Sequence, residues 1–224
     1  MSRFKVYDLP HRGIRNALAQ LLLLAGKTDF RDSREVSGLH RIGLEIFNLL
    51  NKHAADEEEI TLAALEKKHP GASLSDIASH RKASKLLAEL EGQLKDIFER
   101  ASSGVPVLEK GRIFYWALNE FCAVYLLHML EEEVDTQELL WQYFTDAELL
   151  QQRRLIITRM PLEVLLCWLK YIVPAQGQQE RAVFLRGLAG LLTYPCFVEA
   201  IRVIEGVLPL TEWQVLDDDL AAVS

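Results

Sequence analysis

Apolar residues recur at every third or fourth position through most of this chain, and this spacing constrains the fold more than any other feature. It is the period of a helix with one apolar face. Strand signals are nearly missing, because no β-branched and polar residues alternate over a sustained stretch and no Asn-Gly or Asp-Gly turn joins two apolar runs. We therefore predict an all-α fold.

Four long helical segments with short breaks occupy the first two thirds of the chain. The first ends near Gly26 and the second before the His-Pro-Gly turn at 69–71. The third spans about 75–102 and the fourth about 106–144. Long helices joined by short loops are typical of antiparallel bundles. Residues 1–144 are thus predicted to form an up-down-up-down four-helix bundle.

After residue 144 the pattern changes to about five shorter helices, which we interpret as a C-terminal extension over 145–224, packed on the bundle. The stretch 162–173 is apolar almost all round, so it should be buried against other helices rather than solvated on one side. Capping-box pairs mark two helix starts, namely Asp32 with Glu35 and Thr145 with Glu148.

The net charge, the apolar runs and the cysteine spacing exclude several kinds of partner and site. The 224 residues carry a net charge of −7, which repels phosphate backbones and anionic lipid, so neither nucleic acid nor a membrane is an expected partner. No apolar run reaches the roughly 18 residues of a membrane span. The three cysteines (Cys122, Cys167 and Cys196) are widely spaced in apolar runs and form no metal-binding pair. They fit the reduced thiols of a cytoplasmic protein.

Four of the six histidines lie on the apolar stripe of a different predicted helix: His11, His53, His80 and His128. Two of them are followed four residues later by a carboxylate, His53 by Glu57 and His128 by Glu132. This spacing places both side chains on one helix face, about one turn apart. Each predicted helix therefore directs one imidazole to the core, and two helices also direct a carboxylate there.

A buried carboxylate is too costly without a partner, so these pairs indicate metal binding. The order also repeats, a lone inward histidine and then a His-x-x-x-Glu, which predicts two helical hairpins that bring six side chains to one level. Such a site would hold two metal ions with two carboxylates able to bridge them. His40 and His69 do not share this face and should lie at the surface. The acidic runs 56–59 and 131–133 are typical of solvated faces.

Four segments carry a family resemblance: PHRGIR (10–15), LLNKHAADEEEITLAALEKKHPG (49–71), SHRKASKLLAEL (79–90) and YLLHMLEEE (125–133). Over about residues 8–144 they resemble the hemerythrin-like (HHE cation-binding) family, whose domains carry His, His-x-x-x-Glu, His and His-x-x-x-Glu on four successive helices. The resemblance implies a non-haem di-iron site with two Fe ions joined by an oxo or hydroxo bridge. Its ligands would be His11, His53, Glu57, His80, His128 and Glu132, with both glutamates bridging.

One departure from the family pattern matters for function. Oxygen-carrying hemerythrins use five histidines, with an extra one in the third-helix region, where this sequence offers only His80. Fewer protein ligands favour reactivity or sensing over reversible oxygen carriage. Tyr125, three residues before His128, is either a neighbour of the site or an ordinary core aromatic.

These observations favour a cytoplasmic di-iron protein for oxygen, nitric oxide, peroxide or iron handling or sensing, with a small diatomic ligand or peroxide as its partner. Two alternatives stay open. One is a di-iron oxidase or peroxidase, so whether the chain is an enzyme is undecided, and no catalytic residue is assigned. The other is a helical interaction module with a structural or vestigial metal, in which residues 145–224 bind a second copy or another protein.

Overall fold

The structure, a computed structural model, describes residues 3–221 and is entirely helical apart from turns and loops over that range. The prediction of an all-α fold is confirmed. The outermost residues of the two predicted regions, 1–2 and 222–224, lie outside the described residues.

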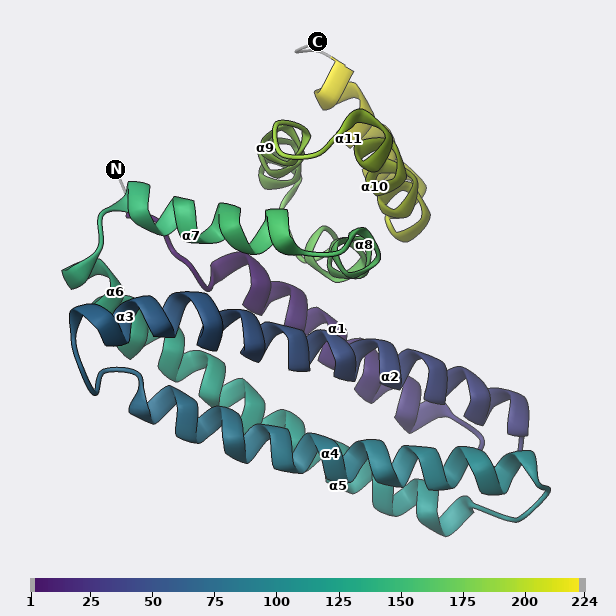
Figure 1. Cartoon of the computed structure of the whole chain (residues 1–224). Helices are drawn as coiled ribbons and strands as arrows, with labels where there is room; N and C mark the ends of the chain where they lie inside the picture. Colours follow the sequence, from purple (N-terminus) through teal and green to yellow (C-terminus); the bar gives the residue numbers. More distant parts are fainter. Residues whose placement is uncertain (1–2, 222–224) are drawn as a thin grey trace.

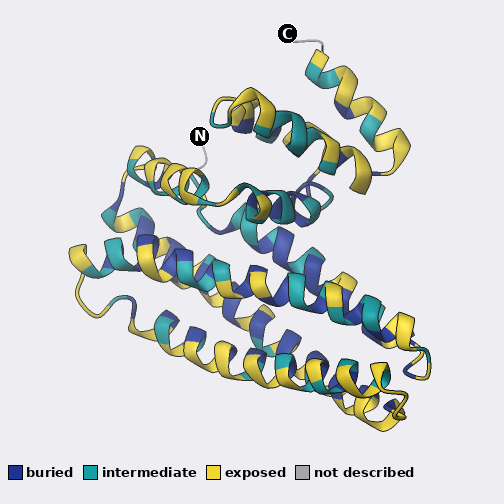
Figure 2. Ribbon diagram, turned by 45° about the vertical axis from the view of Figure 1, so that its right-hand side comes forward, coloured by how far each residue is buried: buried dark blue, intermediate teal, exposed yellow. Residues whose placement is uncertain are grey.

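Four long helices form the bundle: α1 (Asp8–Lys27), α2 (Ser33–Asp56), α4 (Leu74–Ser102) and α5 (Leu108–Glu131). They lie side by side in Figure 1. Helices α1 and α4 each pack against both α2 and α5. Their apolar stripes face inward, and Figure 2 shows the buried positions along the inner faces. The core includes Ile14, Leu21, Leu39, Ile46, Leu87, Leu94, Phe114 and Leu118.

Two of the expected long helices contain a π-helical turn that the apolar spacing did not predict. After α2 the chain passes through η1 (Glu57–Leu62) into α3 (Ala63–Lys68). After α5 it passes through η2 (Glu132–Thr136) into α6 (Gln137–Tyr143). Each of these π-helical turns begins at the glutamate of a His-x-x-x-Glu pair, Glu57 or Glu132. Single π turns inside α-helices occur frequently at functional sites.

The extension contains five helices in its described part: α7 (Asp146–Arg159), α8 (Leu162–Ile172), α9 (Gln178–Ala189), α10 (Tyr194–Val207) and α11 (Leu210–Ala221). It lies on one side of the bundle, next to α1 and α2 (Figure 1). Helix α8 is shared by two cores, which explains why it is apolar nearly all round. Trp168, Tyr171 and Ile172 join the bundle core, whereas Leu165, Leu169 and Val173 pack with α9, α10 and α11.

Local hydrogen bonds explain two of the helix starts. The Thr145 side chain accepts from the backbone N–H of Glu148, whose carboxylate accepts from the backbone N–H of Thr145, so this capping box is confirmed. The other pair behaves differently. Asp32 does cap α2 by accepting from a backbone N–H of the first turn, but Glu35 accepts from the backbone N–H of Asp29 instead.

One helical stretch, Leu108–Tyr143, is long and apolar enough by length and composition to cross a membrane. Phe114, Leu118 and Phe121 on this stretch are at most 1% exposed, because they pack between the bundle helices. The core helix of a soluble protein passes the same test, so the stretch is weak evidence for a membrane span.

Candidate metal centre

The six residues predicted as ligands meet in one layer of the bundle. His11 lies on α1, His53 near the end of α2, His80 on α4 and His128 near the end of α5, while Glu57 and Glu132 begin η1 and η2. All six side chains belong to residues that are at most 4% exposed. The layer separates the main bundle core from a small apolar cluster that closes one end of the bundle, formed by Tyr7, Leu65, Leu140, Phe144 and Leu149.

The Glu57 carboxylate lies between imidazoles from both helical hairpins. Its Oε1 atom is 3.3 Å from Nε2 of His53 and 3.8 Å from Nε2 of His11. Its Oε2 atom is 3.4 Å from Nε2 of His80. One carboxylate thus faces three imidazoles, two on one side and one on the other.

The Glu132 carboxylate also faces three imidazoles from both hairpins, but one of its oxygens lies near an imidazole of each hairpin. Its Oε2 atom is 3.4 Å from Nε2 of both His11 and His128, and its Oε1 atom is 3.3 Å from Nε2 of His80. Two ligand atoms that each lie about 2.1 Å from one ion are about 3 to 4 Å apart. The separations in this cluster are therefore those of atoms that can share a metal, and both carboxylates face imidazoles of both hairpins.

The atoms that face one another in this cluster lack hydrogen-bond partners. Among the described residues this holds for the Nε2 atoms of His11, His53, His80 and His128, for Oε2 of Glu57 and for both carboxylate oxygens of Glu132. Leaving so many polar atoms unpaired in the interior is costly, and a cation removes that cost. Subsets of these residues have their ligand atoms within 4.8 Å of one another. The donor set of imidazole and carboxylate fits iron.

Two further carboxylates contact imidazoles at Nδ1, on the side of the ring that faces away from the cluster. We call them the rear carboxylates. Oε1 of Glu133 is 2.9 Å from Nδ1 of His11, and Oε1 of Glu58 is 3.0 Å from Nδ1 of His80. Arg15 pairs with Glu133 at 2.6 Å. The interpretation of the acidic runs as solvated faces holds for Glu58, which is exposed, but Glu133 is only partly exposed and Asp56 is buried. The apolar spacing does not indicate them, because Glu58 and Glu133 directly follow the inward glutamates and reach histidines on other helices.

The charges within the cluster shift the pKa values in opposite directions. Burial lowers the pKa of His11 and His80, but the negative charges of the neighbouring glutamates outweigh it and raise both pKa values to about 10. Burial prevails at His53, where it lowers the pKa to about 4. For Glu57, burial raises the pKa, yet the surrounding imidazoles lower it overall. The glutamates are thus held as carboxylates, the form that binds a metal.

Comparison with known proteins agrees with this geometry. The family profile of the hemerythrin HHE cation binding domain matches residues 3–140, more than half of the chain. The chain belongs to the hemerythrin HHE cation binding family. It is also 24% identical over 187 residues to F-box/LRR-repeat protein 5 of Mus musculus, an alignment that covers 82% of this chain and 24% of that protein. The chain thus spans about a quarter of that relative's length. No solved structure matches it.

Membership in the HHE family, together with the buried cluster, supports cation binding compatible with iron. The family is generally soluble. The matched HHE region ends before α7, so the extension adds side chains that the family pattern does not specify. One of them, Trp168 on α8, lies edge-on to His53 with ring centres 5.9 Å apart. The sequence around His53 and Trp168 gives no signal that predicts this contact.

Two tyrosines also border the cluster of six side chains (His11, His53, Glu57, His80, His128 and Glu132), which we call the HHE cluster. Tyr7 stacks on His11 with ring centres 5.1 Å apart, and Tyr125 lies edge-on to His128 at 5.7 Å. Both hydroxyl groups are buried without a hydrogen-bond partner in the described range. Tyr125 is therefore both a core aromatic, as part of the bundle core, and a neighbour of the site.

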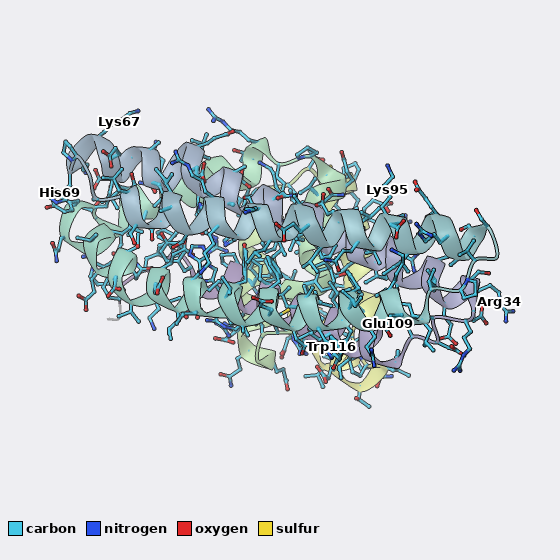
Figure 3. All side chains as sticks on the ribbon, turned by 90° about the horizontal axis from the view of Figure 1, so that it is seen from below. Arg34, Lys67, His69, Lys95, Glu109 and Trp116 are labelled. Atoms are coloured by element: carbon cyan, nitrogen blue, oxygen red, sulfur yellow. The ribbon has the colours of Figure 1, made fainter. Side chains whose placement is uncertain are left out.

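The remaining histidines lie outside the HHE cluster. His69 is exposed at one end of the bundle, beside Lys67 and opposite the end that carries Arg34 (Figure 3). His40 is only partly exposed, because it stacks on Phe98 with ring centres 4.1 Å apart. Neither contacts the six clustered residues.

A cavity of about 890 Å³ reaches the HHE cluster from the side of the extension. His53, Glu57 and Thr61 line its inner part, and Trp168 of α8 forms the adjoining wall. The centre therefore has one side that is open to a small molecule, and this side lies under the extension.

Proposed function

We propose that this protein is a cytoplasmic non-haem di-iron protein that senses or handles dioxygen, nitric oxide or peroxide. The observation that carries the proposal is the set of buried imidazole and carboxylate atoms that face one another without hydrogen-bond partners. The family match makes iron the metal that we propose.

The two halves of the cluster would each hold one ion. His11 and His53 stand with Glu57 on one side, and His80 and His128 stand with Glu132 on the other, while each carboxylate also faces the opposite half. Two six-coordinate ions take about twelve ligand atoms, of which these side chains offer about eight. Bound iron would supply one-electron redox chemistry and open coordination positions for a small molecule.

The protein's own side chains set the conditions of that chemistry. Glu133 and Glu58 accept from Nδ1–H of His11 and His80, which leaves each Nε2 lone pair directed into the cluster. Tyr7 and Tyr125 shield the cluster and bring two hydroxyl groups next to it. Such outer contacts fix the tautomer and the ring orientation of metal-binding imidazoles.

The test is metal analysis of protein purified from iron-replete cells, combined with a visible absorption spectrum. We expect about two irons per chain and a spectrum that azide or nitric oxide shifts, because about four positions stay open. His53→Ala and His128→Ala should each lower the iron content.

Matched controls are available within the chain. His40→Ala and His69→Ala remove imidazoles of the same type outside the cluster, and their iron content should equal that of the unmodified protein. Full iron content in His53→Ala and His128→Ala would contradict the assignment. A spectrum indifferent to azide, nitric oxide and oxygen would indicate a closed, structural metal instead.

A second candidate, a di-iron oxidase or peroxidase, is favoured by the cavity at His53 and Glu57. Its volume of about 890 Å³ is far larger than a diatomic ligand needs and lies in the range of small-molecule sites. Sustained turnover of peroxide by the iron-loaded protein would favour the enzyme, whereas ligand binding without turnover would favour the sensor.

A further inference from the structure

The cavity beside the metal centre has three walls, one of which comes from outside the HHE domain. The first wall is the start of the chain with the beginning of α1, and the second is the end of α2 with η1. The third consists of α7, α8 and α9, which follow the family match that ends at residue 140. Whatever this cavity binds therefore contacts the extension as well as the HHE domain.

The surface of the cavity is mainly apolar. Ile156, Ile157 and Met160 line it from the end of α7, Leu165 from α8 and Leu188 from α9. Two buried polar atoms at its wall, Nε1 of Trp168 and Oγ1 of Thr61, have no hydrogen-bond partner within residues 3–221. Apolar walls with a few convergent polar atoms are typical of small-molecule sites.

Arg153 of α7 supplies the charge that decides the class of ligand. Its guanidinium group lies 5.9 Å from the ring centre of Phe4 and 6.0 Å from that of Phe184, at the cavity wall. It is half-buried, and none of the described carboxylates forms an ion pair with it. Burial without a counter-ion lowers the pKa of Arg153. An arginine held in this way has its hydrogen-bonding capacity available for an anion.

The other arginines of the cavity are already neutralised. Arg3 pairs with Asp146 at 3.1 Å, and Arg12 pairs with Glu180 at 2.8 Å and with Asp8. Lys5 also lines the cavity but is exposed. Arg153 is thus the half-buried cation of this cavity that has no described carboxylate partner.

We propose that the cavity binds a small carboxylic acid with an apolar body, whose carboxylate pairs with Arg153 and whose body extends along the apolar wall toward His53 and Glu57. A single negative charge suits the site better than a phosphate, because Arg153 supplies one unpaired positive charge whereas Arg3 and Arg12 already pair with carboxylates. The inference does not depend on which metal the centre holds.

The test is calorimetric titration of the full chain with decanoate below its micelle concentration, with decanol, decylamine and acetate as comparison ligands. Decanoate should bind at least about tenfold more tightly than decanol, as expected for a charge-assisted pair with arginine. Acetate should bind weakly because it lacks the apolar body, and decylamine because it carries the wrong charge.

Arg153→Met keeps an apolar stem of similar length between the two phenylalanine rings but removes the charge. It should lower decanoate affinity about tenfold or more and leave decanol affinity unchanged. Arg154→Met is the matched control, because Arg154 is exposed on the same helix and does not line this cavity. Its decanoate affinity should equal that of the unmodified protein.

A second pair of variants locates the ligand. Ile156→Trp fills this cavity and should abolish decanoate binding, whereas Leu150→Trp fills a neighbouring hollow on the other side of Arg153 and should not. Equal affinity for decanoate and decanol, full affinity in Arg153→Met, or loss of binding only in Leu150→Trp would each overturn the inference. Iron content measured on the same samples tests the metal centre separately, so either proposal can fail without the other.

Discussion

Nδ1 of His11 lies 2.9 Å from Oε1 of Glu133, the residue directly after the inward Glu132. The same relationship recurs on the other side of the cluster, where Nδ1 of His80 lies 3.0 Å from Oε1 of Glu58, directly after Glu57. In each π-helical turn one glutamate faces the cluster, and the next glutamate contacts one imidazole from its outer side.

The first prediction concerns these two rear carboxylates. Glu133→Ala and Glu58→Ala should each weaken iron binding by about 10- to 100-fold, because the imidazole loses the acceptor that fixes its tautomer and orientation. Glu131→Ala and Glu59→Ala alter exposed neighbours and serve as controls. Competition with a chelator measures the affinity. Equal iron affinity in all four variants would show that the rear carboxylates do not support the ligands.

The second prediction follows from the raised pKa values of His11 and His80, which are about 10 without metal. Both imidazoles are then protonated at pH 7, and each must lose the Nε2 proton before it can bind a cation. His53, with a pKa of about 4, is already neutral. Iron(II) loading at pH 7 should therefore release about two protons per chain from these imidazoles, measurable with a pH indicator in weak buffer.

The same shifts determine how the stability of the metal-free protein depends on pH. Because the folded pKa values of His11 and His80 lie above the ordinary 6.5, their contribution is fully present below pH 6.5 and is lost as the pH rises through about 10. Metal loading should thus stabilise the fold more at pH 9 than at pH 7. Urea unfolding of both forms measures this difference. A metal-dependent gain that shrinks with rising pH would contradict the assignment.

The sequence predicted the positions of the clustered residues well because each one belongs to a helix with a regular apolar stripe. His11 and His80 each lie on such a stripe, and the His-x-x-x-Glu spacing accounts for Glu57 and Glu132. The rear acceptors Glu58 and Glu133 were not predictable in this way, because they lie off the apolar stripes and contact histidines on other helices.

The apolar periodicity of the sequence also does not predict which residues of the extension contact the bundle. The all-round apolarity of 162–173 predicts burial, and α8 is indeed buried, but its pattern does not say which side faces the bundle. That choice depends on a close approach between α1 and α8, at Gly13 and Ile172. Trp168 therefore reaches His53 through tertiary packing alone. The limits of the two predicted regions, 1–144 and 145–224, stay predictions.

The third prediction tests that close approach. A Cβ atom on Gly13 would lie 2.6 Å from Cγ1 and 3.3 Å from Cα of Ile172. Gly13→Ala should therefore push α8 away from α1 and cost about 1 to 3 kcal/mol of stability. Gly38→Ala is the matched control, because nothing lies within 4 Å of its added Cβ and the helix should gain about 0.5 to 1 kcal/mol. Thermal unfolding measures both, and a stabilised Gly13→Ala would contradict the packing.

The last prediction concerns the extension as a cover for the bundle. Tyr171 and Ile172 pack into the bundle core, the carbonyl of Tyr171 accepts from the Asn16 side chain, and Lys170 pairs with Glu45 at 2.9 Å. A chain cut after residue 144 keeps all six clustered residues, so it should still bind iron. It should also expose the apolar face that α8 covers, bind a hydrophobic dye and self-associate in size-exclusion chromatography. A truncated chain that stays monomeric and binds no dye would show that the bundle does not need this cover.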